Sequence, residues 1–170
     1  MIYEIRTYGD PCLSELNQLV DNVDDETKKL LDDMLETMYD TNGVGLAAPQ
    51  IGVNKQLFVI DIGDGPRKVI NPEIIEMSDD CNESDEGCLS VPGIYKKVKR
   101  SNKIRVRYLN ENNEIIEEEM EGFLAKAFQH ENDHLNGVLF IERISPISRR
   151  MISKKLQLMK KARVKNNTKK

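Results

Sequence analysis

Residues 129–135 read Gln-His-Glu-Asn-Asp-His-Leu and hold both histidines of this 170-residue chain. His130 and His134 are four positions apart, a spacing that on a helix puts both imidazoles on one face, with Cβ atoms about 5–6 Å apart. Imidazoles so placed can bind one metal ion. Glu131 lies about 100° further round the helix, where its carboxylate would lie beside the ion and could transfer protons. The stretch therefore predicts a metal-binding helix around which the rest of the chain is organised.

Two histidines do not complete a metal site, so a third ligand must come from elsewhere in the chain. Among the three cysteines, Cys88 is the best candidate because it lies between a glycine and a hydrophobic strand, in a segment that can be held rigidly. Cys12 lies beside a turn and Cys81 in a polar stretch, where ordinary free thiols are expected. One thiolate and two imidazoles leave a tetrahedral divalent ion with an open position, which is typical of catalytic and not of structural sites.

The length of 170 residues is most simply that of one domain with a core of its own. We expect residues 1–147 to form its catalytic part and residues 148–170 a basic C-terminal helix and tail of the same domain. A hydrophobic content of 39% and a charged content of 32% are typical of soluble globular proteins. We see no apolar run of a signal peptide, no segment long enough to span a membrane and no even set of cysteines, and these features favour the cytoplasm.

The formal net charge of −4 conceals an asymmetry along the chain. Ten of the 25 basic residues lie after Ser148 with no acidic residue among them, so residues 1–147 carry 15 basic residues against all 29 acidic ones. An acidic body with a basic tail indicates a polyanionic partner for the tail. The alternative is a solvated, frayed C-terminus. The ten basic residues are Arg149, Arg150, Lys154, Lys155, Lys160, Lys161, Arg163, Lys165, Lys169 and Lys170.

Periodicity and turn residues predict an α+β fold. Apolar residues at helical spacing predict an N-terminal helix over about residues 24–42, a helix over about residues 122–136 around the histidines, and a basic helix after Pro146. Because strands come in runs with the helices set apart, mixed or antiparallel sheets should pack around the central metal-binding helix. The expected strands are Gln56–Ile62, Lys68–Met77, Tyr95–Arg100, Lys103–Leu109 and Glu114–Glu121, with a polar loop at Ser78–Asp85. The buried sides of the central helix should carry Phe123, Leu124, Ala127, Phe128 and Leu135.

Three segments together resemble the motifs of the peptide deformylase family. They are residues 43–50 (Gly-Val-Gly-Leu-Ala-Ala-Pro-Gln), residues 86–90 (Glu-Gly-Cys-Leu-Ser) and residues 129–135 quoted above. The segments occur in the order that the family shows, and the flanking chain also matches, from the N-terminal helix to the basic C-terminal one. Each motif alone has limited specificity, but the three together are highly specific.

The resemblance implies hydrolytic removal of the formyl group from the N-formylmethionine of newly made polypeptides, in a bacterial-type cytoplasm. It implies that Cys88, His130 and His134 bind one divalent ion, typically Fe²⁺, with Zn²⁺, Ni²⁺ or Co²⁺ as alternatives and no other cofactor. Glu131 would take a proton from the attacking water and later deliver it to the leaving amine. For an enzyme that acts on nascent chains, the polyanionic partner of the basic C-terminal helix would be the ribosome.

The family also implies how the substrate is held. The side-chain amide of Gln50 and the backbone N–H of Leu89 would stabilise the oxyanion, and one preorganised donor contributes roughly 2.7–4 kcal/mol. The backbone of Gly43, Val44 and Gly45 could pair with the extended peptide as an added strand, which makes affinity nearly independent of sequence. The alternative is that these small residues merely connect a helix to a strand.

The pocket for the methionine side chain should be apolar, and a charged network should support the metal ligands. Candidates for the pocket by family position are Val44, Phe123 and Ala127. Lys126 occupies a position that is often apolar in the family, and it either lines the pocket with its stem or faces solvent. Glu86 and Arg100 match family positions that form an ion pair, expected here to support the Cys88 segment. Asp133 is expected to have a supporting role and not to be a ligand.

Two other functions fit parts of the pattern. A metallopeptidase of the H-E-x-x-H class would use a histidine or carboxylate beyond the helix as third ligand, but no histidine remains and Cys88 lies upstream. A structural metal module whose basic tail binds RNA would need a fourth protein ligand, which Cys12 or Cys81 could supply.

Overall fold

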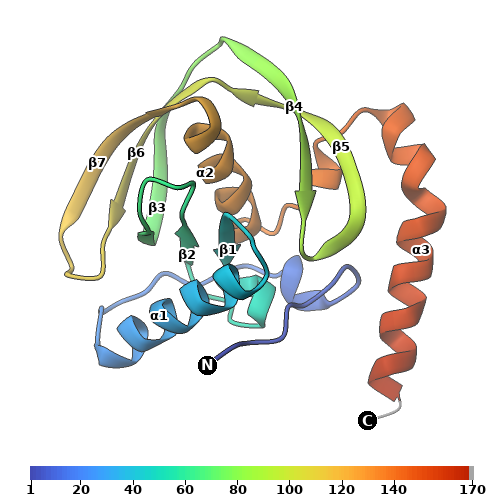
Figure 1. The fold of residues 1–170 in the computed structure, drawn as a ribbon, viewed down its shortest axis with the longest axis horizontal. Coiled ribbons are helices and arrows are strands. Elements are labelled where there is room, and N and C mark those ends of the chain that lie inside the picture. Colours follow the sequence, from blue (N-terminus) through green and yellow to red (C-terminus); the bar gives the residue numbers. More distant parts are fainter. Residues whose placement is uncertain (169–170) are drawn as a thin grey trace.

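The computed structural model describes residues 1–168, with side chains described up to Arg163 (Figure 1). Lys169 and Lys170 of the basic tail lie outside the described residues, as does the side chain of Lys165. The helices are α1 (Asp25–Asp40), α2 (Gly122–Leu135) and α3 (Pro146–Thr168), with 3-10 helices η1 (Pro11–Leu13), η2 (Ala48–Ile51) and η3 (Phe140–Glu142). The strands are β1 (Gly45–Ala47), β2 (Leu57–Ile60), β3 (Arg67–Met77), β4 (Cys81–Cys88), β5 (Val91–Ser101), β6 (Lys103–Leu109) and β7 (Ile115–Glu121).

The strands form a five-stranded sheet in the order β1-β2-β3-β6-β7 and a separate hairpin of β4 and β5. Every strand pair is antiparallel. Figure 1 shows α2 in the hollow between the curved sheet and the hairpin, α1 below the sheet, and α3 on the outer side of β5. The prediction of an α+β fold with antiparallel sheets around a central helix is confirmed.

The position of α2 is set by β2, a short strand that is buried on both faces. Leu57 and Val59 pack in a cluster with α1, whereas Phe58 and Ile60 pack in a cluster with α2. The rings of Phe58 and Phe128 meet edge to face with centroids 5.0 Å apart. Complete burial of such a side chain stabilises the fold by roughly 1.5–3 kcal/mol. These contacts fix the position of α2 on the sheet, and they thereby fix the position of both histidines.

The β6–β7 hairpin shows the alternation that the sequence predicts. β6 spans the expected residues, and alternate positions along it are buried. Opposite charges face each other across the hairpin, Arg105 opposite Glu119 and Arg107 opposite Glu117. Oppositely charged pairs at such positions contribute roughly 0.2–1 kcal/mol.

The polar loop predicted at Ser78–Asp85 is wrong over most of its length. Residues from Cys81 onward form β4, which pairs with β5 in a long hairpin. The strand carries almost no apolar residues because the hairpin covers the core mainly with β5, through Val91, Ile94 and Val98, and β4 adds only Cys88 at its end. Backbone pairing and facing charges, such as Asp85 opposite Lys97, take the place of an apolar face on β4.

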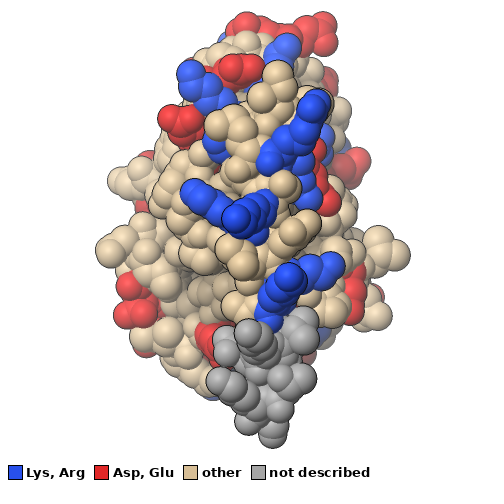
Figure 2. Space-filling model, turned by 90° about the vertical axis from the view of Figure 1, so that its right-hand side faces the viewer, with Lys and Arg blue, Asp and Glu red and all other residues tan. Residues whose placement is uncertain are grey.

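The C-terminal helix α3 packs against the outer side of the hairpin. Ile152 and Leu156 are buried in the same cluster as the apolar residues of β5. Figure 2 shows Lys and Arg side chains along the exposed side of this helix, with acidic residues mostly toward the margins of the view. Within the described part of the chain, none of the helices has the length and apolar character needed to cross a bilayer.

Candidate active site

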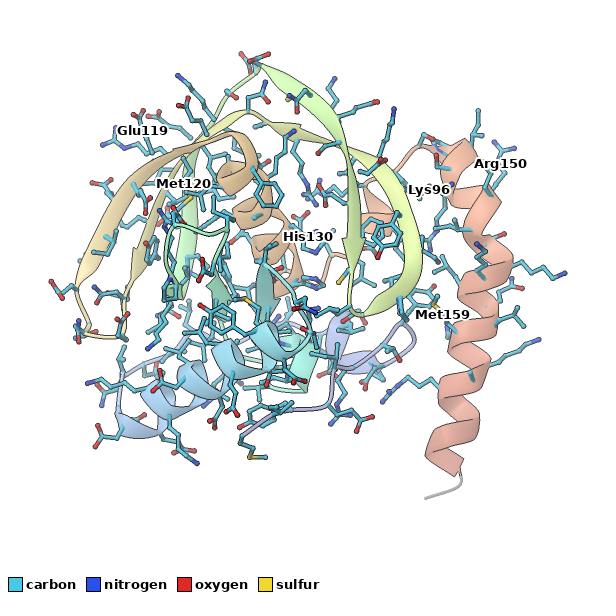
Figure 3. All side chains as sticks on the ribbon, in the orientation of Figure 1. Lys96, Glu119, Met120, His130, Arg150 and Met159 are labelled. Carbon is cyan, nitrogen blue, oxygen red and sulfur yellow. The ribbon has the colours of Figure 1, made fainter. Side chains whose placement is uncertain are left out.

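The three predicted metal ligands come together at the junction of the hairpin and α2. Cys88 is the last residue of β4, and His130 and His134 lie one turn apart on α2. One ligand atom from each residue lies within 4.8 Å of the other two, and Cys88 Sγ is 3.3 Å from His134 Nε2. Two ligand atoms of a tetrahedral site are roughly 3.3–3.7 Å apart. In Figure 3, His130 extends from α2 into the space between the sheet and the hairpin.

The hydrogen bonds around the histidines fit a bound divalent cation. His130 Nδ1 lies 2.8 Å from Oε1 of Glu86, a carboxylate that favours an Nδ1–H and leaves Nε2 for a metal. His134 Nδ1 is buried without a hydrogen-bond partner among the described residues. Burial lowers the pKa of His134 well below its usual value, which keeps the imidazole in the neutral form that binds metals.

The surroundings of His130 favour positive charge. Burial alone would lower its pKa, but hydrogen bonds with Cys88 and Glu86 raise that pKa to about 10. The groups that face His130 thus favour positive charge at this position, which fits a site for a divalent cation.

Glu131 is buried beside this set, with its carboxylate against the backbone of β1. Its Oε1 lies 3.9 Å from His130 Nε2, and its Oε2 has no hydrogen-bond partner among the described residues. Burial raises the pKa of Glu131 to about 7. A Cβ atom added to Gly45 would lie 2.8 Å from Glu131 Oε1, so only glycine leaves room for this carboxylate. The first motif therefore meets the third through a close backbone approach.

Gln50 lies on the 3-10 helix η2 with its side chain fixed at both ends. Its Oε1 accepts the backbone N–H of Ala47 at 3.0 Å. Its Nε2 donates to Ser90 Oγ at 3.1 Å and to Cys88 Sγ at 3.4 Å. The side-chain amide is thus presented next to the thiol, and Leu89 lies in the turn that joins β4 to β5.

A network of buried charges connects the hairpin to α2. The predicted ion pair is present: Arg100 donates from Nε and Nη2 to the two oxygens of Glu86, both at 2.9 Å. Arg100 Nη1 also donates to Asp133 at 2.5 Å, and Asp133 accepts two further bonds from Arg143. Burial would raise the pKa of Glu86, but the hydrogen bonds from His130 and Arg100 and the charge of Arg100 lower it to about 2. The carboxylate that orients His130 is therefore ionised at neutral pH.

A cavity of about 500 Å³ opens over these groups. Such a volume is within the range of small-ligand sites. Residues predicted to bind substrate line it, together with Lys126, whose place at the pocket the sequence left open. Phe123 is 58% exposed at the cavity rim, so its expected burial on α2 is wrong. The lining includes Gly43, Val44, Gly45, Phe123, Ala127, Leu89, Tyr95 and Glu131.

The other two cysteines lie apart from the metal ligands. Cys12 Sγ donates to the backbone oxygen of Pro49 at 3.3 Å, and Cys81 Sγ is 3.9 Å from Ser101 Oγ. The ligand cluster contains neither of them. A closed four-ligand site built with Cys12 or Cys81 is therefore not formed by the described residues.

Three residues that hold this site had no role predicted from the sequence. Ser90, fully buried, accepts from Gln50, and its place in the second motif was the available signal. Gln129 exchanges hydrogen bonds with the backbone of Ser101 at 3.2 and 2.9 Å and so joins α2 to β5. The role of Arg143 could not be predicted from the sequence, because Arg143 lies beyond the end of α2 and contacts Asp133 only in the folded chain.

Known proteins resemble the chain over nearly its whole length. The family model for polypeptide deformylase matches residues 2–150. A peptide deformylase from Fusobacterium nucleatum is 54% identical over 164 residues, which are 95% of this chain and 94% of the relative. The crystal structure of the peptide deformylase from Thermotoga maritima has a TM-score of 0.84 at 51% identity and covers 86% of this chain and 99% of its own. A Synechococcus elongatus peptide deformylase in complex with actinonin has a TM-score of 0.85 at 41% identity, over 89% and 85% of the two chains.

These matches agree with the geometry described above. The family model spans all three motifs, since it matches residues 2–150. Since the family model covers most of the chain and the F. nucleatum relative nearly all of it, the chain belongs to the peptide deformylase family.

Proposed function

We propose that Glu131 is the proton-transfer group in the hydrolysis of the formamide bond of N-formylmethionyl peptides. The observation that carries this proposal is the position of its carboxylate, buried against Gly45 and 3.9 Å from His130 Nε2, with Oε2 unpartnered among the described residues. A carboxylate in such a position, with a pKa of about 7, can accept a proton and return it at neutral pH.

Cys88, His130 and His134 would hold the divalent ion, which would supply Lewis acidity and lower the pKa of water. Glu131 takes one proton from the water that attacks the formyl carbon. As the carbon–nitrogen bond of the tetrahedral adduct breaks, Glu131 returns that proton to the leaving amine. The products are formate and a free amino terminus, and the carboxylate is ready for another cycle.

The charge that develops on the formyl oxygen is stabilised by two neutral donors. Gln50 offers its side-chain amide, held by Ala47 and Ser90, and Leu89 offers its backbone N–H from the β4–β5 turn. Donors fixed before the reaction need no reorganisation when the oxyanion forms. Their fixed positions support this role, because neither donor depends on a flexible charged side chain.

The substrate peptide pairs with the edge of the five-stranded sheet. β1 is the last strand of that sheet, and the segment from Gly43 to Gly45 lines the cavity. Backbone pairing at this edge leaves affinity largely independent of sequence beyond the first residue. Val44, Phe123 and Ala127, with the stem of Lys126, form the pocket for the methionine side chain.

The ion in the cell is Fe²⁺, as the family resemblance implies. One thiolate and two imidazoles suit iron, zinc, nickel and cobalt alike, so the ligand set supports a metal without selecting one. Metal analysis of protein purified without oxygen, combined with the activity of each preparation, decides the identity of the ion.

The variant Glu131→Gln tests the proposed role. Protein prepared without oxygen should release formate from a formyl-Met peptide, and Glu131→Gln should keep its metal and lose at least 100-fold in kcat, since acid–base catalysis contributes roughly 10²–10⁴-fold. Glu119→Gln, an exposed change on β7, serves as control. Absence of formate from the metal-loaded wild type would reject deformylation, and cleavage of internal peptide bonds would favour a metallopeptidase.

We also propose that the protein acts in the cytoplasm, where α3 binds the ribosome through its basic residues. Figure 3 shows Arg150 extending outward from α3, whereas Met159 packs with the apolar cluster beneath the helix. Truncation after Ser148 is a poor test because it removes buried Ile152 and Leu156. Charge changes on the exposed side leave that packing in place.

The triple variant Lys154→Gln, Lys155→Gln, Lys161→Gln should bind ribosomes more weakly, with a shallower dependence on salt, while peptide turnover is kept. The control carries the same three changes at Lys28, Lys29 and Lys103, which are exposed elsewhere. Equal ribosome binding by both triple variants would reject the proposal for α3.

A further inference from the structure

The two proposed oxyanion donors lie on separate parts of the chain. Gln50 belongs to η2, which follows the edge strand of the sheet, whereas Leu89 lies in the turn of the separate hairpin. The side chain of Gln50 joins the two parts directly through Ser90 and Cys88, and a third element adds backbone hydrogen bonds to both.

The N-terminal segment 6–8 makes that connection through its backbone. The N–H of Arg6 donates to the carbonyl oxygen of Gln50 at 2.6 Å, and the N–H of Tyr8 donates to the carbonyl oxygen of Ser90 at 2.8 Å. Gln50 and Ser90 also bond to each other through their side chains. The segment thus holds Gln50, which carries one donor. It also holds Ser90, which directly follows Leu89, the residue that carries the other donor.

The segment has no regular secondary structure and is anchored at Asp10. Asp10 Oδ1 accepts the N–H of Cys12 at 3.0 Å and so caps η1. Its Oδ2 accepts from Arg6 at 3.2 Å and also forms an ion pair with Arg163 of α3. Only 7% of Asp10 is exposed, so these contacts form in a poorly hydrated place where charge pairs are little screened.

Close packing of the backbone supports the same anchor. Gly9, at φ +100°, lies against Lys160 of α3, with the position of a Cβ atom only 3.1 Å from Lys160 Cγ. The guanidinium of Arg6 covers Gly52, the residue that ends η2. Cys12 donates its thiol to the carbonyl oxygen of Pro49, next to Gln50. The contacts run from α3 through the N-terminal segment to η2.

We propose that Asp10 and Arg163 are positioning residues for deformylation, which hold the N-terminal segment so that Gln50 and Leu89 present their donors together. The inference rests on the roles proposed above for Gln50 and Leu89. Neither Asp10 nor Arg163 lines the cavity, so their loss should leave substrate binding intact. The loss should instead loosen the donors at the moment the oxyanion forms, and small displacements of catalytic groups are costly in rate.

Two substitutions break the pair in different ways. Asp10→Asn keeps an oxygen that can cap η1 but removes the charge. Arg163→Gln is the milder change, because Asp10 keeps its contacts with Arg6 and the Cys12 amide. If Asp10→Asn does not fold, the kcat of Arg163→Gln alone tests the positioning role. We expect each to lower kcat about tenfold with KM changed less than twofold, per folded and metal-loaded enzyme. The double variant should be no slower than the slower single one, because the pair acts as a unit.

Matched variants separate positioning from general effects of charge. Asp24→Asn alters another helix cap of the same type, and Arg105→Gln removes one arginine charge from an exposed strand position. Both should keep the wild-type kcat. Arg163→Lys retains the charge and should restore at least half of the kcat lost in Arg163→Gln. Metal content and thermal unfolding are measured on every variant so that kcat refers to folded, loaded enzyme.

A merely structural role predicts a different result: lower thermal stability with an unchanged kcat per loaded enzyme. That result, or a rise in KM with kcat unchanged, would overturn the inference. Gln50→Ala in the same series tests the oxyanion-donor role of Gln50, on which the inference rests. This variant should lower kcat about 100-fold or more. Full activity of Gln50→Ala would reject the proposed oxyanion site, whereas a slow Gln50→Ala beside a fast Arg163→Gln would reject the positioning role alone.

Discussion

At the scale of single residues, the contact of Gly45 with Glu131 is a tight constraint on the site. A Cβ atom at position 45 would lie within 3.0 Å of three atoms of the Glu131 side chain. Gly45→Ala should therefore displace the carboxylate, and because displacement by 1 Å can cost about 100-fold, kcat should fall by roughly that factor. Steady-state kinetics with metal analysis checks this.

Gly43→Ala provides the comparison for that experiment. A Cβ atom at position 43 would meet its nearest neighbours at 3.6 Å, an ordinary van der Waals distance. Its effect on kcat should be far smaller than that of Gly45→Ala. Equal losses in the two variants would show that the strand, and not room for the carboxylate, is what the glycines provide.

Residues of the site differ in how far the sequence could predict them. His130, His134 and Glu131 form a local pattern on one helix. The common face of the two histidines follows from their spacing alone, and Glu131 lies about 100° further round. The placement of Gln50 and Leu89 needed the family resemblance, because nothing local connects them to the histidines. The close approach of Gly45 to Glu131 joins parts of the chain 86 positions apart. No local rule encodes such a contact.

At the scale of elements, β4 shows why an alternating apolar pattern is not required for a strand. β6 alternates because one of its faces meets the core, and its predicted limits were right. β4 has no such face, since β5 supplies the apolar cover of the hairpin. Charge complementarity between the two strands replaces the pattern, with Glu83 opposite Lys99 and Asp85 opposite Lys97.

Charge reversal on the hairpin tests this account. Asp85→Lys places two lysines opposite each other and should destabilise the protein by roughly 0.2–1 kcal/mol, seen as a lower Tm in thermal unfolding. Adding Lys97→Asp restores an opposite pair in reversed order and should recover most of the loss. If the double variant is no more stable than Asp85→Lys, the facing charges do not stabilise the hairpin.

The anchor of α3 predicts how stability depends on pH. Burial would raise the pKa of Asp10, but the Cys12 amide and the charges of Arg163 and Arg6 lower it. The unfolded chain then binds the proton more tightly than the native one, so the contribution of Asp10 is complete above about pH 4 and is lost as pH falls through the native pKa. Between pH 6 and pH 3, urea unfolding should show a larger loss of free energy for the wild type than for Asp10→Asn. A loss of equal size in both would contradict this.

At the scale of the whole molecule, the ligand set adds a further connection between the hairpin and α2. Cys88 ends the hairpin, whereas both histidines lie on α2. A ligand that binds only the folded state at 1,000 times its Kd adds about 4 kcal/mol. For a chain of this length, that corresponds to a Tm higher by about 10 °C.

Removal of the metal should therefore lower the Tm by about 10 °C, and restoring the ion without oxygen should reverse the change. Cys88→Ser should start from a lower Tm and respond less to the chelator, because the thiolate ligand is gone. Differential scanning calorimetry under anaerobic conditions checks both. An unchanged Tm on metal removal would mean that the bound metal does not stabilise the fold, and that other contacts hold the three ligands together.

The N-terminal segment that holds the oxyanion donors also affects when a new molecule reaches full activity. The segment 6–8 is made first, but its anchor includes Arg163, near the end of the chain. At about 5–20 residues per second, roughly 10–30 s of translation separate the two. The positioning role proposed above therefore predicts that a copy whose Arg163 has not yet been made works about tenfold more slowly than a finished one, so that finished copies should process most new amino termini.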